Sequence, residues 1–510
     1  MSHGVDNVAN NDGRDGGALY SVAQVRAFDQ HAIQVLGVPG YTLMPRAAEA
    51  ALQLLRKRWP QTRRIVVVTG GGNNGGDGLV LARLARSAGL EVCVLAMAAV
   101  AQLRDDARRA ADDLLAAGVE LLPFAALASN ARLLSGADVI VDALLGSGLR
   151  SAVRADYGQA IDAINASGLP VLALDLPSGL DGDSGAVLGA AVRANCTITF
   201  VGNKTGLYLG QGPEYAGAVT LADLQLPVPA GADAQPLLQT LGDLDIARAL
   251  PPRAREAHKG NFGRVLIIGA GPGMPGAVRL AGESCLRSGA GIVVCAIAPE
   301  NMPAIAEARP ELICIATRSA ADISAALASA TVVAIGPGLG LDDWARELYA
   351  AALAAGKPLV IDADALTVLA QAGVRAPPGS ILTPHPGEAA RLLGVATAEI
   401  QKDRLVSLQA LVAKTQATVV LKGAGTLIGM PGQVPALCTA GNPGMAAPGM
   451  GDVLTGLVAG IRAQCGDPWL AARAGVQAHA RAGDALAQRN GARGLLALEL
   501  AAELPHWLNT

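Results

Sequence analysis

Two glycine-rich segments in different halves of the chain each end in an aspartate. The first spans residues 70–77 and reads GGGNNGGD, and the second spans residues 441–452 and reads GNPGMAAPGMGD. Each follows an apolar or β-prone run and leads into a helical pattern, where backbone N–H groups converge and can hold an anion. The sequence therefore predicts phosphorylated ligands at two places, and two active sites on one polypeptide.

The first segment matches neither common phosphate-binding motif. It lacks the usual context of the G-x-G-x-x-G dinucleotide motif and the G-K-[ST] of a P-loop. Residues 202–205 resemble the tail of a P-loop, but there is no glycine five residues before Lys204, where Thr199 stands. A purely structural turn is the alternative interpretation. Asn73 and Asn74 favour a site, because their amides can coordinate a cation or a ribose and tolerate a left-handed backbone.

Two further aspartates, Asp142 and Asp175, stand at or near the ends of predicted strands. Each is followed by a tight turn, within residues 142–149 and 175–181. Ligands of open α/β sheets bind at the carboxyl ends of the strands, so we expect both carboxylates to face one crevice with residues 70–77. Turn capping explains either aspartate alone, but three such segments at one crevice favour a site.

In the second half, the helix expected to begin near Asp452 can hold a transferring phosphoryl group with its N-terminal N–H groups and its dipole. Asp452 itself can act as the catalytic base toward a hydroxyl. Lys422 begins the strand-end segment KGAGT, which suits a nucleotide-phosphate clamp. His385 stands between two prolines, which favours a surface role. Asp362 and Asp364 follow a predicted strand, and they are equally compatible with a functional role and with capping of the next helix.

The elements that must position these residues are alternating strands and helices, which indicate right-handed βαβ crossovers and mainly parallel sheets. Ser21 is expected to cap the first helix. The expected strands are 64–69, 91–97, 137–144, 170–174, 196–201, 264–268, 292–297, 331–335, 359–361, 380–382 and 418–421. Helices are expected at 76–87, 103–117, 452–462, 468–488 and 495–507.

A proline-rich stretch at residues 226–257 interrupts this alternation and is predicted to be a linker. It separates an expected α/β domain at residues 20–225 from a second at residues 258–510. Residues 1–19 are predicted to form a disordered tail. The 51% hydrophobic content with only 3% aromatic residues suits α/β layers packed with small aliphatic side chains.

Composition also limits the partners. The formal net charge is −3 and the basic residues are scattered, which argues against nucleic-acid binding. The seven cysteines are an odd number without a Cys-x-x-Cys pair, which favours buried free thiols in a reducing compartment over disulfides or zinc. No run of 18 apolar residues occurs, so we expect no membrane span and a cytoplasmic protein.

Together these motifs resemble those of the bifunctional NAD(P)H-hydrate repair enzymes, over nearly the whole chain from about Ser21. The first half resembles the NAD(P)H-hydrate epimerase domain through residues 73–78, 142–149 and 174–179. The second half resembles the ADP-dependent NAD(P)H-hydrate dehydratase domain, a relative of the ribokinase-like kinases. Its matching residues are 258–265, 273–277, 335–340, 382–388, 422–426 and 442–452.

The resemblance implies an N-terminal Rossmann-like α/β/α sandwich followed by a C-terminal ribokinase-like α/β/α domain. It implies an isomerase that interconverts the R and S forms of NADH and NADPH hydrated at C6. It also implies a lyase that dehydrates the S form at the expense of ADP, giving AMP and phosphate. We further expect a homo-oligomer.

The resemblance assigns roles residue by residue. Asp175 is implied to be the acid/base of the epimerase, with Lys204 as a neighbour. Its hydrated substrate is implied to contact Asn73, Asn74, Gly75, Gly76, Asp77, Gly146, Ser147, Gly148, Leu149, Arg150, Ser151, Ala152 and Asp175. A potassium ion there is implied to be held by Asn74, Asp142 and Ser178. At the second site, substrate is implied to contact Ala277, Gly338, His385 and Asp452. ADP, which is expected to carry Mg²⁺, is implied to bind Lys422, Gly423, Ala424, Gly425, Thr426 and Gly451.

The anion loop departs from this resemblance at two positions. Such enzymes usually carry Thr or Ser where this chain has Ala447, and a small residue, often Gly, where it has Pro448. A hydroxyl donor and an N–H donor are therefore lost beside the expected anion hole. Two other functions remain open: a ribokinase-like small-molecule kinase fused to a nucleotide-binding domain, and a first half that only binds nucleotide. Asp142 and Asp175 argue against the latter, because a pure binder needs no acid/base.

Overall fold

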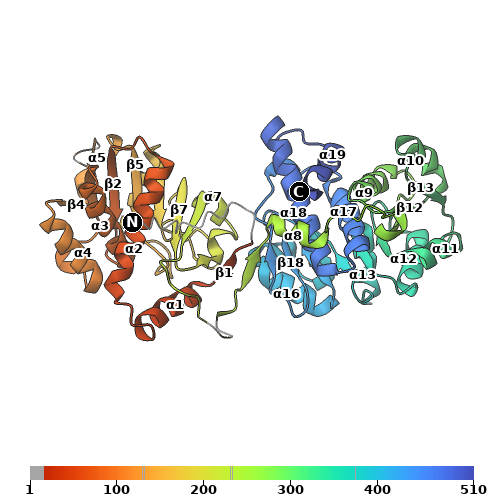
Figure 1. Cartoon of the computed structure of the whole chain (residues 1–510), viewed down its shortest axis with the longest axis horizontal. Helices are drawn as coiled ribbons and strands as arrows, with labels where there is room; N and C mark the ends of the chain where they lie inside the picture. The colour runs from red at the N-terminus through yellow and green to blue at the C-terminus, as the bar shows by residue number, and fades with distance from the viewer. Residues whose placement is uncertain are drawn as a thin grey trace. The chain divides into compact units, whose positions relative to one another are not determined.

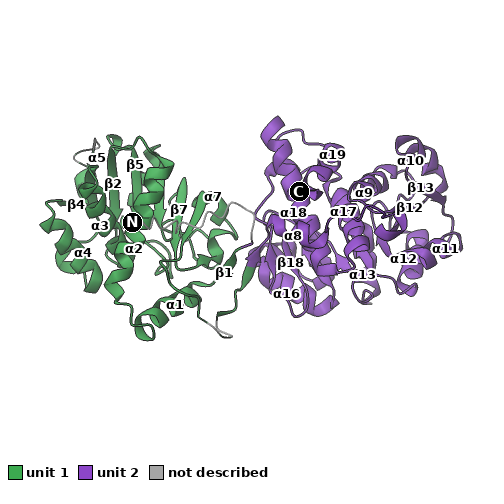
Figure 2. Cartoon of the chain, in the orientation of Figure 1, with its two compact units in different colours: residues 1–12, 17–238 green, residues 13–16, 239–510 purple. Residues whose placement is uncertain are grey.

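The computed structural model describes residues 16–128, 130, 132–229, 231, 234–373 and 375–509. The chain divides into two compact units, residues 17–238 and residues 239–510, with Gly16 assigned to the second (Figure 2). Each unit is an α/β structure, as predicted (Figure 1).

Unit 1 is built on a parallel sheet whose described strands run in the order β4-β3-β2-β5-β6-β7-β9. These strands are β2 (Arg64–Thr69), β3 (Glu91–Ala96), β4 (Leu121–Pro123), β5 (Val139–Ala143), β6 (Val171–Leu174), β7 (Cys196–Phe200) and β9 (Ala218–Ala222). Successive side chains of a strand point to opposite faces. Accordingly, Ile65 and Val67 lie in one buried cluster and Val66 and Val68 in another, so the sheet has a core on each face.

Helices cover both of these cores and complete an α/β/α sandwich. Over the first lie α1 (Val22–Gln34), α2 (Gly40–Arg58), α3 (Asn73–Ser87) and α4 (Asp105–Ala116). Over the second lie α5 (Arg132–Ser135) and α6 (Ala155–Ala166), and α7 (Gly212–Ala216) precedes β9. Ser21 caps α1 in a capping box with Gln24, as predicted.

The predicted tail is wrong at its last residues. Strand β1 (Ala18–Tyr20) pairs in parallel with β8 (Asn203–Lys204), and Leu19 is fully buried. The apolar Ala-Leu-Tyr run therefore belongs to the fold, because its burial offsets the cost of ordering it. Residues 1–15 lie outside the described part of the chain.

Unit 2 has a mixed sheet with the strand order β13-β12-β11-β14-β15-β16-β17-β18-β19-β10. Its strands are β10 (Leu238–Thr240), β11 (Arg264–Ile268), β12 (Ile292–Ile297), β13 (Ile313–Ala316), β14 (Val332–Ile335), β15 (Leu359–Ile361), β16 (Ile381–Leu382), β17 (Thr418–Leu421), β18 (Leu427–Gly429) and β19 (Ala436–Leu437). Pairing is parallel from β13 to β17, and β18 is antiparallel to both β17 and β19. The carboxyl ends of the parallel strands thus meet at one edge, where a ligand is expected.

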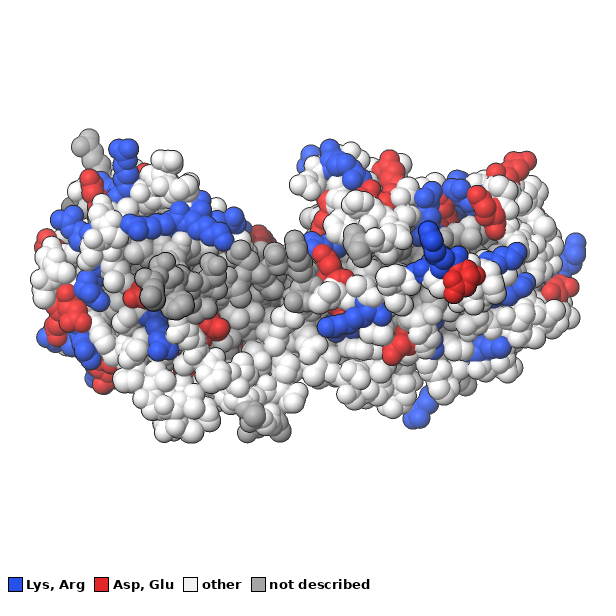
Figure 3. Space-filling view, in the orientation of Figure 1, with Lys and Arg blue, Asp and Glu red and all other residues white. Residues whose placement is uncertain are grey.

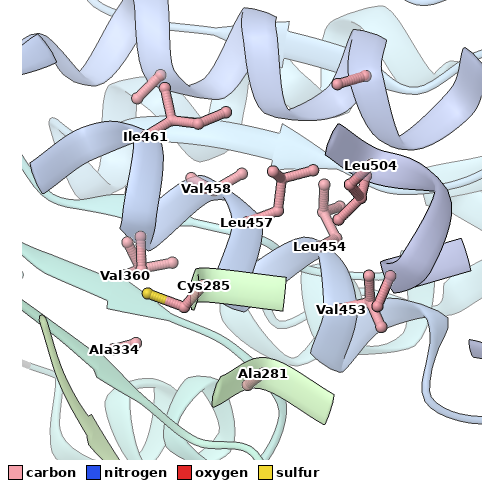
Figure 4. Close-up of a cluster of buried hydrophobic side chains, with 14 of the residues drawn as sticks. Ala281, Cys285, Ala334, Val360, Val453, Leu454, Leu457, Val458, Ile461 and Leu504 are labelled. Atoms are coloured by element: carbon pink, nitrogen blue, oxygen red, sulfur yellow. The ribbon is translucent and has the colours of Figure 1, made fainter. Parts of the chain in front are cut away.

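The helices of unit 2 are α8 (Asp243–Ala249), α9 (Pro275–Arg287), α10 (Met302–Ala308), α11 (Ser324–Ser329), α12 (Asp343–Ala354), α13 (Ala363–Ala372), α14 (Pro386–Leu393), α15 (Thr397–Lys402), α16 (Arg404–Thr415), α17 (Met450–Cys465), α18 (Pro468–Asn490) and α19 (Ala497–Leu508). Helix α17 lies in the core, and its Leu457 and Val458 pack among side chains of α9, α19 and the sheet (Figure 4). A Cβ at Gly456 would lie 1.8 Å from the Ala281 carbonyl oxygen, so glycine lets α17 approach α9 closely. The first turn of this buried helix carries Asp452.

The predicted linker contains regular structure. Strand β10 and helix α8 both fall within residues 226–257. The carboxylate of Asp245 in α8 accepts a hydrogen bond from Arg473 of α18 at 2.8 Å, and both side chains are buried. The prolines that indicated a linker flank these short elements instead of excluding them, so the linker interpretation was wrong for residues 238–249.

The structure also describes the length of the helices, the state of the cysteines and the charges on the surface. No described helix is long and apolar enough to cross a membrane. All seven cysteines are free thiols, as predicted, but only four of them are buried, and Cys93, Cys314 and Cys465 are half-buried. Basic and acidic side chains both lie on the face of each unit that Figure 3 shows.

Two candidate active sites

The first candidate site contains a buried ion pair after strand β6. Asp175 directly follows β6 and adopts a left-handed backbone with φ of 65°. The Nζ atom of Lys204 lies 2.5 Å from Asp175 Oδ1, and it also donates to Thr199 Oγ1 and the Phe200 carbonyl. The Lys204 side chain is only 2% exposed.

This pairing decides the protonation state of Asp175. Burial alone would raise the pKa of Asp175, but the Lys204 charge and hydrogen bonds from Lys204 and Ser147 hold it below its usual value. Asp175 is therefore ionised near neutral pH and can accept a proton. Its second oxygen, Oδ2, accepts the Ser147 N–H at 3.1 Å, which joins the predicted segment 146–152 to the predicted acid/base.

The second feature of this site is a buried pair of Asp142 and Ser178. The Ser178 hydroxyl donates to Asp142 Oδ1 at 2.6 Å, and the Ser178 N–H donates to Asp142 Oδ2 at 2.8 Å. The Leu145 N–H in turn donates to Ser178 Oγ at 2.8 Å. Burial raises the pKa of Asp142 to about 6, although the hydrogen bonds from Ser178 and Leu144 oppose this. The structure thus brings Asp142 and Ser178 together, as predicted, and also gives them a role in holding the turn.

Asn74 contributes an amide that has no protein partner. Residues 73–77 were predicted to be a loop, but α3 begins at Asn73, so they form its first turn. Both amide atoms of Asn74 are buried and have no hydrogen-bond partner among the described residues. A Cβ at Gly146 would lie 3.1 Å from Asn74 Cβ and 3.2 Å from Asp175 Oδ2, which places Asn74 next to the ion pair. A buried amide left unpaired costs roughly 1–3 kcal/mol, so it indicates a ligand at this position.

Two more acidic groups lie in the electrostatic environment of Asp175. Burial raises the pKa of Asp77 well above its usual value, and the charges of Asp175 and Asp29 act in the same direction. Burial likewise raises the pKa of Asp29, in α1, to about 6. Asp77 was predicted to belong to the site. Asp29 was not, because the sequence pattern around it indicated only a packing helix.

The second candidate site is at the start of helix α17. Gly449 precedes the helix with φ of 85°, which a residue with a side chain rarely adopts. Asp452 lies in the first turn. Burial raises the pKa of Asp452 to about 6; the neighbouring charge of Asp362 adds to this and that of Lys422 opposes it. Asp452 thus has a pKa close to that of an efficient general base near neutral pH.

Lys422 directly follows β17, and its side chain lies near the start of α17. Its Nζ lies 2.7 Å from Asp362 Oδ1 and 4.0 Å from Glu388 Oε2. A Cβ at Gly451 would lie 3.4 Å from the same Nζ, so the ammonium group faces the first turn of α17. The sequence left open whether Asp362 caps a helix. It makes no side-chain cap to α13, and instead its Oδ2 accepts a hydrogen bond from Thr455 at 2.7 Å.

His385 lies at the surface, as its flanking prolines predicted, with a side chain that is 51% exposed. It caps α14 by accepting the Gly387 N–H at Nδ1, and Glu388 completes a capping box. The Nε2 atom lies 3.4 Å from Glu388 Oε1. Burial raises the pKa of Glu388 to about 7, while burial and the Lys422 charge lower the pKa of His385. Glu388 is therefore an ionisable member of this site that the sequence prediction did not include.

The remaining predicted substrate contacts, Ala277 and Gly338, are neighbours in space. A Cβ at Gly338 would lie 3.3 Å from Ala277 Cβ, and Gly338 has φ of 57°. Ala277 lies in the first turn of α9, which packs against α17. Both residues therefore lie at or near the start of α9, the helix that packs against α17.

Comparison with known proteins follows this division of the chain. A family model described as NAD(P)H-hydrate dehydratase matches residues 265–506, and one described as YjeF-related protein N-terminus matches residues 40–206. The bifunctional NAD(P)H-hydrate repair enzyme Nnr of Coxiella burnetii is 46% identical over 488 residues, which cover 96% of this chain and 98% of that protein. The chain belongs to the bifunctional NAD(P)H-hydrate repair enzymes.

Two further proteins of known sequence or structure are similar. The Nnr enzyme of Escherichia coli is 41% identical over 486 residues, which cover 95% of this chain and 93% of that enzyme. A ribokinase-like superfamily protein from Enterococcus faecalis matches with a TM-score of 0.50 and 31% identity, and covers 53% of this chain and 95% of its own. The predicted fold, a Rossmann-like unit followed by a ribokinase-like unit, is confirmed.

Arg404 supports the 422–426 segment and was missed by sequence reasoning. Its guanidinium group donates to the carbonyls of Leu421 and Lys422 through Nη2 and to those of Ala424 and Gly425 through Nη1. One half-buried arginine thus fixes the backbone of the strand-end segment in a repair enzyme of this family. No local spacing could reveal it, because Arg404 lies about a helix length away in the sequence.

The departures at Ala447 and Pro448 lie in a loop that other residues hold. The Asp484 carboxylate accepts the Gly441 N–H and the Asn442 amide, both at 2.9 Å. His479 Nε2 lies 3.0 Å from the Met450 carbonyl at the start of α17. Ala447 itself packs against the main hydrophobic cluster of unit 2. The loop is therefore anchored at both of its ends, independently of Ala447.

Proposed function

We propose that the chain repairs hydrated NADH and NADPH at two separate sites. The site of Asp175 interconverts the R and S forms at C6, and the site of Asp452 dehydrates the S form with ADP. The single observation that carries this proposal is that each unit holds one carboxylate whose surroundings shift its pKa, downward at Asp175 and upward at Asp452. Asp175 is kept ionised by Lys204, and Asp452 is half-buried at the N-terminus of a helix that can hold phosphate. We assign the first activity to residues 20–225 and the second to residues 258–510.

At the first site, the C6 centre inverts through reversible bond breaking. The ionised Asp175 takes the proton of the C6 hydroxyl while the C6–N1 bond breaks, which leaves an aldehyde at C6 and the electron pair on the ring nitrogen. The nitrogen then attacks the other face of the aldehyde, and Asp175 returns the proton to the oxygen. Asn73, Asn74, Gly75, Gly76 and Asp77 and the segment 146–152 enclose the nucleotide in this proposal. The Ser147 N–H holds Asp175 in place.

A potassium ion fits the residues of the first site. The unpaired amide of Asn74, the Asp142 carboxylate and the Ser178 hydroxyl supply oxygen atoms of the kind that such a cation prefers. We propose that these three residues hold it. A bound cation would supply positive charge that lowers the pKa of Asp142 and helps to orient the nucleotide.

At the second site, ADP acts as the phosphoryl donor. Asp452 takes the proton of the C6 hydroxyl, and that oxygen attacks the β-phosphorus of ADP as its bond to AMP breaks. Phosphate then leaves from C6, and loss of a proton from C5 restores NADH or NADPH. We propose that Ala277, Gly338 and His385 contact the hydrated substrate. ADP binds at Gly451 and along the segment 422–426. Mg²⁺ enters with the nucleotide, because it binds through phosphates with few protein ligands.

The products distinguish this proposal from a small-molecule kinase. Incubation of the protein with hydrated NADPH and ADP should release AMP and phosphate in equal amounts and restore the absorbance of the dihydronicotinamide. A kinase would instead accumulate a phosphorylated product. Such accumulation, without restored absorbance, would refute the dehydratase half of the proposal.

The cation proposal predicts a dependence of the epimerase on potassium. We expect Asn74→Ala, or replacement of potassium by a larger organic cation, to weaken binding of the hydrated substrate about tenfold or more. Asn74 makes no side-chain bond to described protein groups, so its truncation should leave the unfolding temperature unchanged. Asp142→Ala should cause the same loss with lower stability.

Asp138→Ala is the matched control, since Asp138 accepts two backbone N–H groups just before β5, at its other end. Epimerase kinetics measured in both salts test the prediction. Unchanged kinetics in Asn74→Ala and in the organic salt would leave Asp142 with a turn-holding role alone.

The anion loop gives a second prediction. Restoring the missing donors with Ala447→Thr and Pro448→Gly should raise the dehydratase kcat by less than about tenfold. The N–H groups of residues 449–451, the dipole of α17 and Lys422 remain in place and can hold the transferring phosphate. Ala446→Thr is the control, because this neighbouring residue is exposed. A much larger gain would show that the enzyme works with an incomplete anion hole.

A further inference from the structure

Helix α1 lies against the first site, although no motif of that helix indicated a function. Arg26 in α1 donates a hydrogen bond from Nη2 to the Ser147 carbonyl at 2.6 Å. A Cβ at Gly148 would lie 3.8 Å from the same nitrogen, so the guanidinium group lies along the segment 146–152. One turn later on the same face, Asp29 experiences the charges of Lys204 and Asp175. Two independent observations thus place this face of α1 at the site.

The helix is held firmly enough to act as a support. Ser21 and Gln24 form its capping box, and the Val22 N–H donates to Asp183 Oδ1 at 2.7 Å. Two of its apolar side chains, Val25 and Phe28, are buried in the core of unit 1. Arg26 therefore projects from a fixed element toward a segment that has no regular structure.

The contacts of Arg26 lead directly to the acid/base. Arg26 binds the Ser147 carbonyl, the Ser147 N–H binds Asp175 Oδ2, and Lys204 binds Asp175 Oδ1. Arg26 thus holds Ser147 through its carbonyl group, while the Ser147 N–H donates to the carboxylate of Asp175. Hydrogen bonds to a charged acceptor are strong and geometrically sensitive. Release of the carbonyl would let the N–H turn away from Asp175.

We propose that Arg26 is a positioning residue for epimerisation, which acts by holding Ser147 so that its N–H keeps Asp175 oriented and ionised. This inference rests on the proposed role of Asp175. It extends the site to helix α1, outside the segments that the sequence motifs indicated.

Kinetics of R-to-S conversion by the full-length protein test this inference. Arg26→Met should lower the epimerase kcat/KM about tenfold and move the acidic limb of its pH profile to higher pH by about one pH unit. The limb moves upward because the ionised form of Asp175 loses a hydrogen bond, while Lys204, Asp29 and Asp77 remain. Arg26→Lys, which keeps a charged donor, should recover most of the rate.

Arg56→Met is the matched control, because Arg56 also donates Nη2 to a backbone carbonyl, that of Ala88 at 2.9 Å, at an exposed place in the same unit. Unfolding temperatures of both Met variants equal to that of the wild type would show that the fold is intact. Wild-type epimerase activity with an unchanged pH profile in Arg26→Met would overturn the inference alone. Absence of epimerase activity in the wild type would overturn the proposed function and this inference with it. If Arg26→Met unfolds, the folded Arg26→Lys variant decides: a lowered unfolding temperature with the wild-type rate and an acidic limb at the wild-type pH would assign Arg26 a structural role only.

Discussion

Replacement of Asp452 by Asn will reduce ADP-dependent dehydration by about a hundredfold or more, while interconversion of the R and S forms persists. Asn has nearly the same shape and keeps the first turn of α17, but it cannot take a proton from the C6 hydroxyl. Loss of a positioned general base costs about two to four orders of magnitude. The measurement is the rate of dihydronicotinamide recovery from the pure S form with ADP.

Asp343→Asn provides the matched control, since Asp343 is also in the first turn of a helix in unit 2 but is exposed. The wild-type rate should further fall as pH drops through about 6, because burial raises the pKa of Asp452 to that value and the protonated carboxyl is no base. Near wild-type dehydration by Asp452→Asn would mean that another group takes the proton.

Replacement of Lys204 by Met will abolish most epimerase activity and destabilise unit 1. Lys204 is 2% exposed and pairs with Asp175 at 2.5 Å, so the variant leaves a carboxylate that is buried and unpaired. Breaking such a buried pair from one side costs about 3–5 kcal/mol. Asp175→Asn together with Lys204→Met removes both charges, and should recover much of the free energy of unfolding without recovering the activity.

The effect of Lys204→Met on the free energy of unfolding should depend on pH. In the wild type the pKa of Asp175 is lowered in the folded state, so its stabilising contribution is present above the unfolded pKa and is lost as pH falls through the folded pKa. In Lys204→Met, burial without the ammonium group should raise the pKa of Asp175 above its unfolded value. The variant should then lose stability as pH rises, and denaturant unfolding at several pH values measures this. Dehydration of the S form by unit 2 is the internal control. Equal stability of Lys204→Met and wild type at all pH values would contradict the role of the pair.

The sequence predicted the central strands well because these strands are buried on both faces. Residues 65–68 of β2 are a continuous apolar run, and the predicted and observed bounds of this strand agree. Short strands such as β4, at the edge of its sheet, and β19, inside its sheet, were missed, since two or three residues carry too little pattern. The linker prediction was wrong for a related reason. Pro251 and Pro252 come one residue after the end of α8, and the sequence alone does not show that a short helix packs beside them.

The sequence predicted those site residues that belong to local motifs. Asp142 lies near the end of β5, Asp175 directly follows β6, and Asp452 lies in the first turn of α17. The residues that tune them come from distant parts of the chain. Arg26 and Arg404 bind backbone carbonyls about 120 and 20 residues away in sequence, and such contacts leave no spacing that a single sequence can reveal.

The most direct test of two sites on one chain supplies only the R form of hydrated NADPH, with ADP and potassium. We expect the full-length protein to convert all of it to NADPH, with one AMP formed per NADPH, because the first site supplies the S form that the second consumes. With Asp452→Asn the R form should reach equilibrium with S and stop there. Failure of the wild-type protein to restore NADPH from the R form, while it does so from the S form, would contradict the assignment of an epimerase to unit 1.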